Sequence, residues 1–351
     1  MGDGFAKGTI GNYASALKSF TKFCDENNIA EELRFPTDER VLCAFLSSLN
    51  KSVSGSTAKT TLTALKRWHD MHRITWNGSE RHNIMVRGIT NNTPAESKRP
   101  KRPAVTTRML MDLNSALDHN DPKDSAILAC ALTAFFGQAR LGELLATSRL
   151  KHNPSTHPSR NSIIILLNSN AREIELPRTK TSQADGESIY LTRQSDPLDP
   201  VKALENHLHV NHSLATSDHL FAYRSSTSQT GRHSLTIEDF MRRVNDIWTC
   251  LGHQRVTGHS FRIGGTTTLL RNGVPPDVVK ELGRWSSDAF HVYWRDIPEI
   301  ATRHVEFLQL SMPTTVIASG NNNGQARRSL RHVNRHNGRT QLQGRPAYRP
   351  Y

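Results

Sequence analysis

TGHSFRIGGTTTLLRNGVPPDVVKELGRWSSDAFHVYWRDI, residues 257–297, is a stretch whose apolar spacing predicts helices but whose polar side chains are not needed for helix packing. His259 and Arg262 stand three residues apart, so they share one face near the start of a predicted helix. Backbone N–H groups at a helix start favour an anion. Gly264 and Gly265 allow close backbone approach or tight packing of this helix. The stretch therefore indicates chemistry on a phosphate.

A second, shorter helix is predicted in the middle of this stretch. Pro275 or Pro276 fits the first turn of a helix, and Gly283 is placed to end it. Trp285 then lies in a loop, and the segment SSDAFHVYWR predicts a further helical turn that carries Tyr293. The apolar residues of the short helix that we expect to be buried are Val278, Val279 and Leu282.

A second polar group stands in the segment GQARLGELLAT, residues 137–147. Arg140 lies between a predicted buried helix and another apolar stretch, where a charge without a partner would be costly. Glu143, three residues on, is placed to hold the guanidinium. Two interpretations stay open: a structural ion pair, or an arginine that is held ready for an anion.

Composition narrows the class of partner. The chain has 351 residues, a formal net charge of +13 and a pI of about 9.9, which favour nucleic acid first and an anionic membrane second. The longest apolar run, AILACALTAFFG, is too short to span a bilayer and predicts a buried helix. The first residues contain no apolar segment of the kind found in secretory signals, and the four cysteines form no Cys-x-x-Cys motif.

The order of patterns predicts a mainly α-helical chain with a small antiparallel β-sheet. Helices with caps at Thr9 and Thr37, and a third over STAKTTLTALKRWHDMH, fill a helical domain at 1–92. A basic linker at 93–108 leads to a domain at 109–312, and a basic, disordered tail is expected at 313–351. In the second domain SIIILLN, REIELP and SIYLTR predict the sheet, and Ser234 is the expected cap of a later helix.

Two groups of basic residues are candidates for contacts with phosphates. Lys59, Lys66 and Arg67 share the polar face of the third helix, which is either a solvated surface or a phosphate-contacting face. The linker motif SKRPKRP fits a strap on DNA and also a nuclear-localisation signal. Its basic residues are Lys98, Arg99, Lys101 and Arg102.

Histidines gather in NHLHVNHSLATSDH without a cysteine or carboxylate frame, so this segment predicts a helix followed by a loop and no metal site. The histidines are His207, His209, His212 and His219.

Taken together, ARLGELLA, GHSFRIGGTTTLL and LGRWSSDAFHVYWR resemble the conserved boxes of the tyrosine recombinases, the lambda-integrase-like enzymes of DNA strand exchange. Their style is closest to the eukaryotic Crypton-like recombinases of mobile elements. The resemblance implies a two-domain, C-shaped DNA clamp, with a SAM-like core-binding domain before the catalytic domain. The C-terminal boxes are its specific part.

Carried over residue by residue, the resemblance makes Arg140 and Arg262 the pair that clamps the scissile phosphate, with Glu143 as support. His259 matches the histidine that handles a proton, and Trp285 the position filled by His or Trp in the family. Lys180, between two predicted strands, matches the general-acid lysine, with Lys202 and Arg178 as weaker competitors.

Tyr293 matches the nucleophile, although Trp285 to Tyr293 is one residue shorter than the commonest spacing. The implied reaction forms a 3′-phosphotyrosyl link without metal, ATP or another cofactor. We expect a recombinase or integrase that binds double-stranded DNA as a homotetramer on paired sites, with no membrane or small-molecule substrate. Two other readings are a type IB topoisomerase-like enzyme and a DNA-binding descendant without catalysis. The expected location is the nucleus if the host is eukaryotic, otherwise the cytoplasm or nucleoid.

Overall fold

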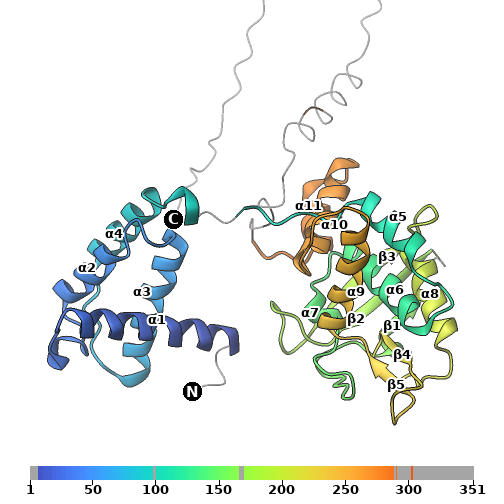
Figure 1. Ribbon diagram of the computed structural model, residues 1–351, viewed down its shortest axis with the longest axis horizontal. Coiled ribbons are helices and arrows are strands. Elements are labelled where there is room, and N and C mark those ends of the chain that lie inside the picture. The colour runs from blue at the N-terminus through green and yellow to red at the C-terminus, as the bar shows by residue number, and fades with distance from the viewer. Residues whose placement is uncertain (1–6, 98–99, 166–169, 288–289, 291–301, 303–351) are drawn as a thin grey trace, which may run out of the picture. The chain divides into compact units, whose positions relative to one another are not determined.

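The computed structural model describes residues 7–97, 100–165, 170–287, 290 and 302, and its elements form two groups along the chain (Figure 1). The first group is helical, and the second combines helices with two small antiparallel sheets. The mainly α-helical class with a small antiparallel sheet is therefore confirmed. The domain bounds expected from the sequence stay predictions.

The first group contains α1 (Lys7–Glu26), α2 (Glu39–Ser48), α3 (Gly55–His72) and α4 (Glu80–Asn91), with a short 3-10 helix over Glu31–Leu33. Apolar residues at helical spacing turn one side of each helix inward, so that α1 packs on α3, and α4 packs on α2 and α3. The buried core of this group includes Phe20, Cys24, Leu42, Phe45 and Leu65.

The starts of two of these helices differ from the prediction. Thr9 lies inside α1 and does not cap it. The cap of α2 is Asp38, whose carboxylate accepts a hydrogen bond from the backbone N–H of Arg40 at 2.8 Å. Thr37 is buried instead, because its backbone N–H donates to Nε2 of His69 at 3.0 Å. A tertiary contact thus removed the threonine from the capping position.

The residues of the expected basic linker differ in their exposure. A short 3-10 helix covers Ala95–Ser97, and Lys101 and Arg102 are exposed. Val105 is buried, and its backbone N–H donates to the carbonyl oxygen of Ser260 at 3.0 Å. The last residues of the expected linker therefore belong to the core of the second group. Lys98 and Arg99 lie outside the described residues.

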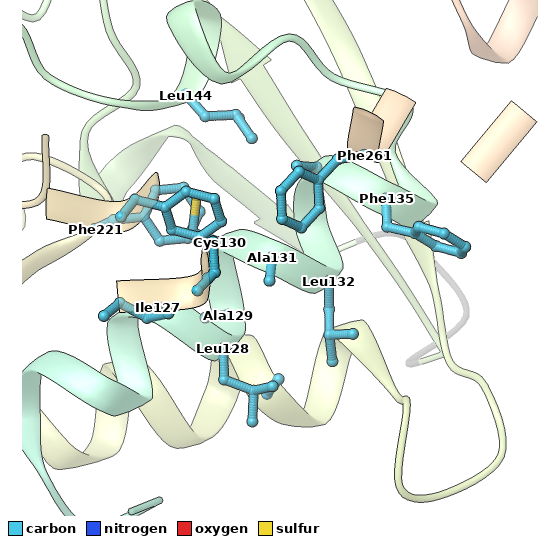
Figure 2. Close-up of a cluster of buried hydrophobic side chains, with 14 of the residues drawn as sticks. Ile127, Leu128, Ala129, Cys130, Ala131, Leu132, Phe135, Leu144, Phe221 and Phe261 are labelled. Carbon is cyan, nitrogen blue, oxygen red and sulfur yellow. The ribbon is translucent and has the colours of Figure 1, made fainter. Parts of the chain in front are cut away.

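In the second group α6 (Pro122–Phe136) carries the long apolar run and is buried on nearly all sides (Figure 2). Three longer helices, one short helix and the strand β4 (Ala222–Arg224) pack against it. The other helices of this group are α5 (Thr107–Ala116), α7 (Leu141–Leu144), α8 (Pro200–Val210), α9 (Ile237–Cys250), α10 (His259–Arg271) and α11 (Pro276–Leu282). Among the described residues no helix is long and apolar enough to cross a membrane. The run is a core helix, as expected.

The predicted sheet is present as β1 (Ile163–Ile165), β2 (Ala171–Leu176) and β3 (Glu187–Thr192), in the order β1-β2-β3 with antiparallel neighbours. Leu176 pairs with Glu187, so the β2–β3 turn runs from 177 to 186 and carries Lys180. A second ladder joins β4 (Ala222–Arg224) and β5 (Arg232–Ser234). Ser234 therefore ends a strand, and Thr236 caps α9 in its place.

The glycine pair lets α10 lie directly against its neighbours. A Cβ on Gly265 would overlap the carbonyl oxygen of Phe135 at the end of α6, and one on Gly264 would overlap that of Val105. Close backbone approach is thus confirmed. The helix α11 starts at Pro276 and ends before Gly283 as predicted, but Val278 is exposed and only Val279 of the valine pair is buried.

Candidate active site

Arg140 occupies a turn between α6 and α7. Gln138 has a left-handed backbone (φ 47°), which reverses the chain after α6 and makes Arg140 the residue before α7. The guanidinium donates from Nη1 to Oε1 of Glu143 at 2.5 Å, and the backbone N–H donates to Oε2 at 3.1 Å. Glu143 is buried, whereas a quarter of the Arg140 side chain is exposed. The pair therefore holds an arginine that an external anion can still reach.

Arg262 meets the same turn from α10. Its side chain is fully buried, and Nη1 donates to the carbonyl oxygen of Gln138 at 2.5 Å. Nη2 donates to the carbonyl oxygen of Gly283, and the guanidinium carbon lies 4.2 Å from the ring centre of Trp285. The turn just before Arg140 and the loop of Gly283 and Trp285 therefore meet at this one guanidinium of α10. Trp285 is a cation–π partner of this guanidinium. Its indole N–H can donate a hydrogen bond but cannot relay a proton, so a packing role suits it.

His259 stands at the first position of α10 and is half-buried. The preceding Gly258 packs against the side chain of Leu141, so the start of α10 lies beside the start of α7 and its Arg140. The fold thus brings the histidine next to the arginine turn. Tyr293, the predicted nucleophile, lies outside the described residues.

Lys180 is exposed on a tight turn. The Thr179 backbone N–H donates to the carbonyl oxygen of Ser182 at 2.8 Å, and the Ser182 N–H donates to the Thr179 hydroxyl at 3.0 Å. These bonds turn the chain so that Lys180 points outward. Of its competitors, Lys202 pairs with Asp196 on another part of the domain at 2.8 Å. Arg178 donates to the Gln183 side chain at 2.9 Å.

Arg284 was missed by the sequence reasoning. Its backbone is left-handed (φ 56°), and only 7% of its side chain is exposed. Nη2 donates to Oε2 of Glu143 at 2.7 Å, and Nε lies 3.4 Å from a carboxylate oxygen of Glu187 on β3. Burial lowers the pKa of Arg284, and the two carboxylates act in the opposite direction. The only sequence signal was an arginine directly after the helix-ending glycine, which by itself fits an exposed loop.

The predicted DNA contacts on α3 stand on one exposed stripe. Lys59, Lys66 and Arg67 are exposed, and the buried residues Leu65 and His69 face the other way. Arg67 has an ion pair with Asp70 at 3.5 Å. The stripe has the geometry of a surface that can contact a polyanion, and a solvated surface would look the same.

The histidines of residues 207–219 are mainly structural. His207 is buried and hydrogen-bonds the carbonyl oxygen of Leu220 at 3.0 Å, and His219 accepts the backbone N–H of Phe221 at 3.1 Å. Burial lowers the pKa of His207 to about 4 and that of His219 to about 3. Within the described part of the chain no three His, Cys, Asp or Glu side chains could hold a metal ion together.

No protein-family model and no curated protein matches the sequence. A solved structure of the XerH site-specific recombinase, bound to palindromic difH substrate in a post-cleavage complex, is 17% identical, with a TM-score of 0.55 over 86% of this chain and 79% of that one. The chain has the fold of a tyrosine recombinase. The likeness shows this fold alone, since the identity is low.

Two further tyrosine recombinase structures align less well. The pre-cleavage complex of XerH with difH has a TM-score of 0.48 and 16% identity over 84% of this chain and 78% of that one. A lambda integrase dimer bound to a COC′ core site has a TM-score of 0.46 and 14% identity, over 83% of this chain and 72% of that one.

Proposed function

We propose that the chain is a site-specific DNA recombinase or integrase that cuts and rejoins strands through a 3′-phosphotyrosyl link on Tyr293. The observation that carries this proposal is the meeting of Arg140, Arg262 and Trp285 around one turn, within a tyrosine recombinase fold. Guanidinium groups suit this task because each is permanently charged and presents paired donors to phosphate oxygens.

In the proposed reaction the Tyr293 hydroxyl attacks the scissile phosphorus, a P–O bond to tyrosine forms, and the bond to the 5′ oxygen breaks. His259 accepts the tyrosine proton, and Lys180 gives a proton to the departing 5′ oxygen. The arginines stabilise the charge that builds on the phosphate oxygens, a role that needs no metal ion in this scheme. The 5′ hydroxyl of a partner strand then reverses the step.

The burial of Arg262 adds a requirement to this scheme. Because the side chain has no exposed surface and Trp285 covers its face, a phosphate reaches it only when the turn with Gly283 and Trp285 shifts. Arg140 needs no such movement, since part of its side chain is exposed. The proposal therefore assigns the first contact with the phosphate to Arg140.

The proposed partner is double-stranded DNA, held by α3 and the basic linker, with four copies of the chain on paired sites. The high positive charge supports DNA as the partner. A relation to Crypton-like recombinases and, in a eukaryotic host, a nuclear location are parts of the same proposal.

The test measures whether the full chain forms a covalent adduct with DNA. The DNA in adducts captured from the cell of origin is then sequenced. Wild type should form the adduct in excess EDTA and without ATP. Tyr293→Phe should bind DNA with unchanged affinity but form none, because a phenyl ring has no nucleophilic oxygen. An adduct that survives this substitution, or that requires magnesium, refutes the mechanism.

Two outcomes would replace the proposed function. Relaxation of supercoiled plasmid without any recombinant product would favour a type IB topoisomerase-like enzyme. Retention of DNA with no adduct under any condition would favour a DNA-binding protein without catalysis.

A further inference from the structure

Arg284 lies between two carboxylates that lead to different parts of the candidate site. It follows Gly283, whose carbonyl oxygen accepts a hydrogen bond from Arg262, and it precedes Trp285, which covers Arg262. We propose that Arg284 is a positioning residue that fixes the Arg140 guanidinium and the Lys180 turn relative to one another. This inference rests on the proposed function.

The first connection runs through Glu143. Oε2 of this carboxylate accepts from Arg284 Nη2 at 2.7 Å and from the Arg140 backbone N–H at 3.1 Å, while Oε1 accepts from the Arg140 guanidinium. Both oxygens are therefore engaged, and the carboxylate cannot rotate without losing bonds. Glu143 and Arg284 are each more than nine-tenths buried, so the bonds form where water does not weaken them. Arg284 thereby limits the positions open to Arg140.

The second connection runs through Glu187. Arg284 Nε lies 3.4 Å from Oε2 of this residue, and the Thr181 hydroxyl donates to Oε1 at 3.0 Å. Thr181 directly follows Lys180 in the β2–β3 turn. An ion pair at the base of the strand thus anchors the residue beside the proposed general acid.

The arrangement differs from an ordinary structural ion pair. Arg284 keeps a left-handed backbone, which is unfavourable for a residue with a Cβ and persists only where surrounding contacts enforce it. Two of its guanidinium nitrogens, Nε and Nη1, are buried without a hydrogen-bond acceptor among the described residues. The left-handed backbone and the two unbonded nitrogens cost stability. We therefore assign Arg284 to holding Glu143 and Glu187 at a set distance and not to stabilising the fold.

The experiment measures single-turnover formation of the covalent adduct by the full chain on two DNA substrates. One has the natural 5′-bridging oxygen, and the other has sulfur there, a leaving group that needs no proton. Arg284→Met should slow the reaction of the oxygen substrate on the order of 100-fold, because both connections are lost. The sulfur substrate should restore only the part of the lost rate that depends on proton donation by Lys180. Binding of DNA should stay within about twofold of wild type, a change that costs little free energy.

Thr181→Val and Glu187→Gln isolate the second connection, and neither removes a cation from the core. Both variants should react slowly with the oxygen substrate. Both should react at almost the wild-type rate with the sulfur substrate, because only the turn of the general acid is loosened. Arg284→Lys should give an intermediate rate, since an ammonium group cannot span both carboxylates. These three variants keep the test decisive if Arg284→Met does not fold.

Arg243→Met is the matched control. Arg243 on α9 pairs with Asp124 on α6 through bonds of 3.1 and 2.7 Å, so it is a half-buried arginine–carboxylate pair away from the candidate site. It should lose stability but keep the wild-type rate per folded molecule. Two results would overturn this inference and leave the proposed function standing. One is an equal loss of rate in Arg243→Met and Arg284→Met, and the other is a wild-type rate in both Arg284→Met and Thr181→Val. A wild type without any adduct would overturn the proposed function as well.

Discussion

Two helices carry basic residues that are candidates for contacts with phosphates, and their surroundings in the structure are opposite. On α3, Lys59, Lys66 and Arg67 stand in solvent along one stripe, opposite the apolar face that packs on α1. On α10, Arg262 is fully buried, and its Nη1 and Nη2 donate to the backbone carbonyl oxygens of Gln138 and Gly283. The exposure of the α3 residues therefore follows from their position on the helix. The burial of Arg262 follows only from the elements that pack around α10.

The difference also concerns what surrounds the charge. An exposed lysine interacts with phosphates through a field that salt screens within about 8 Å at physiological ionic strength. A buried guanidinium is oriented by fixed partners, and its interactions are strengthened by the lower dielectric. The α3 group is suited to affinity without sequence preference, and the α10 group to one defined geometry.

The same substitution on both helices should give the largest contrast. Arg262→Lys should slow adduct formation at least about 100-fold, because an ammonium group cannot make the paired bonds of the guanidinium. Arg67→Lys should change neither the rate nor DNA affinity by more than about twofold, since an exposed cation is replaced by another. Single-turnover cleavage and DNA titration check the pair. Equal tolerance at both positions would remove the contrast between the helices.

Glycine-to-alanine substitutions test the packing behind that contrast. Gly265→Ala should destabilise the second group by about 3 kcal/mol, because the new methyl group meets the Phe135 carbonyl oxygen on α6. Gly88→Ala on α4 should stabilise the first group by about 0.5 kcal/mol, since no atom beyond its chain neighbours and the nearby backbone of its own helix lies within 4 Å of the new Cβ. Thermal and urea unfolding measure both. A stable Gly265→Ala protein would show that α10 does not lie against α6 as described.

Acid should destabilise the second group through its buried histidines. Burial lowers the pKa of His207 to about 4 and of His219 to about 3, below the unfolded value near 6.5. The unfolded chain therefore binds these protons first, so stability is full above pH 6.5 and falls as the pH is lowered towards the folded pKa values. Between pH 7 and pH 5 the two should together lower the free energy of unfolding by about 3 to 4 kcal/mol.

The pH effect is measured by urea unfolding at a series of pH values. His207→Gln should flatten the curve, because a neutral amide takes up no proton. His207 is a good choice, since Nδ1 lies 3.2 Å from the Asn211 amide nitrogen, which leaves no acceptor there for a second ring proton. An unchanged curve in this variant would contradict the assignment.

Neutral substitutions on α3 should have the smallest effect. Lys59→Gln with Lys66→Gln should weaken binding to all DNA sequences alike and lower the slope of log affinity against log salt by about 0.9 for each lost phosphate contact. Unfolding free energy should change by less than about 0.5 kcal/mol, because both side chains are exposed. An unchanged salt slope would assign the stripe to solvent.

Local patterns predicted the elements well and their ends less well. The helices, the β2–β3 turn with Lys180 and the end of α11 at Gly283 followed from apolar spacing and from residues that favour turns. The caps at Thr37 and Ser234 were wrong, because the capping residues are Asp38 and Thr236. More than one residue that can cap a helix stands near each of these helix starts. The local sequence does not show which of them is engaged in a tertiary contact and is therefore unable to cap.

The sequence alone determined which residue types stand at which spacing, and hence the boxes with Arg140, His259 and Arg262. Only the tertiary structure decided that Arg262 is buried beneath Trp285 and that Arg284 joins Glu143 to Glu187. The reason is physical. Spacing along a chain reports the near neighbours within one helix or strand. The bond from Arg262 to Gln138 spans 124 residues and the bond from Arg284 to Glu143 spans 141, so only the packing of α10 on α6 brings these partners together.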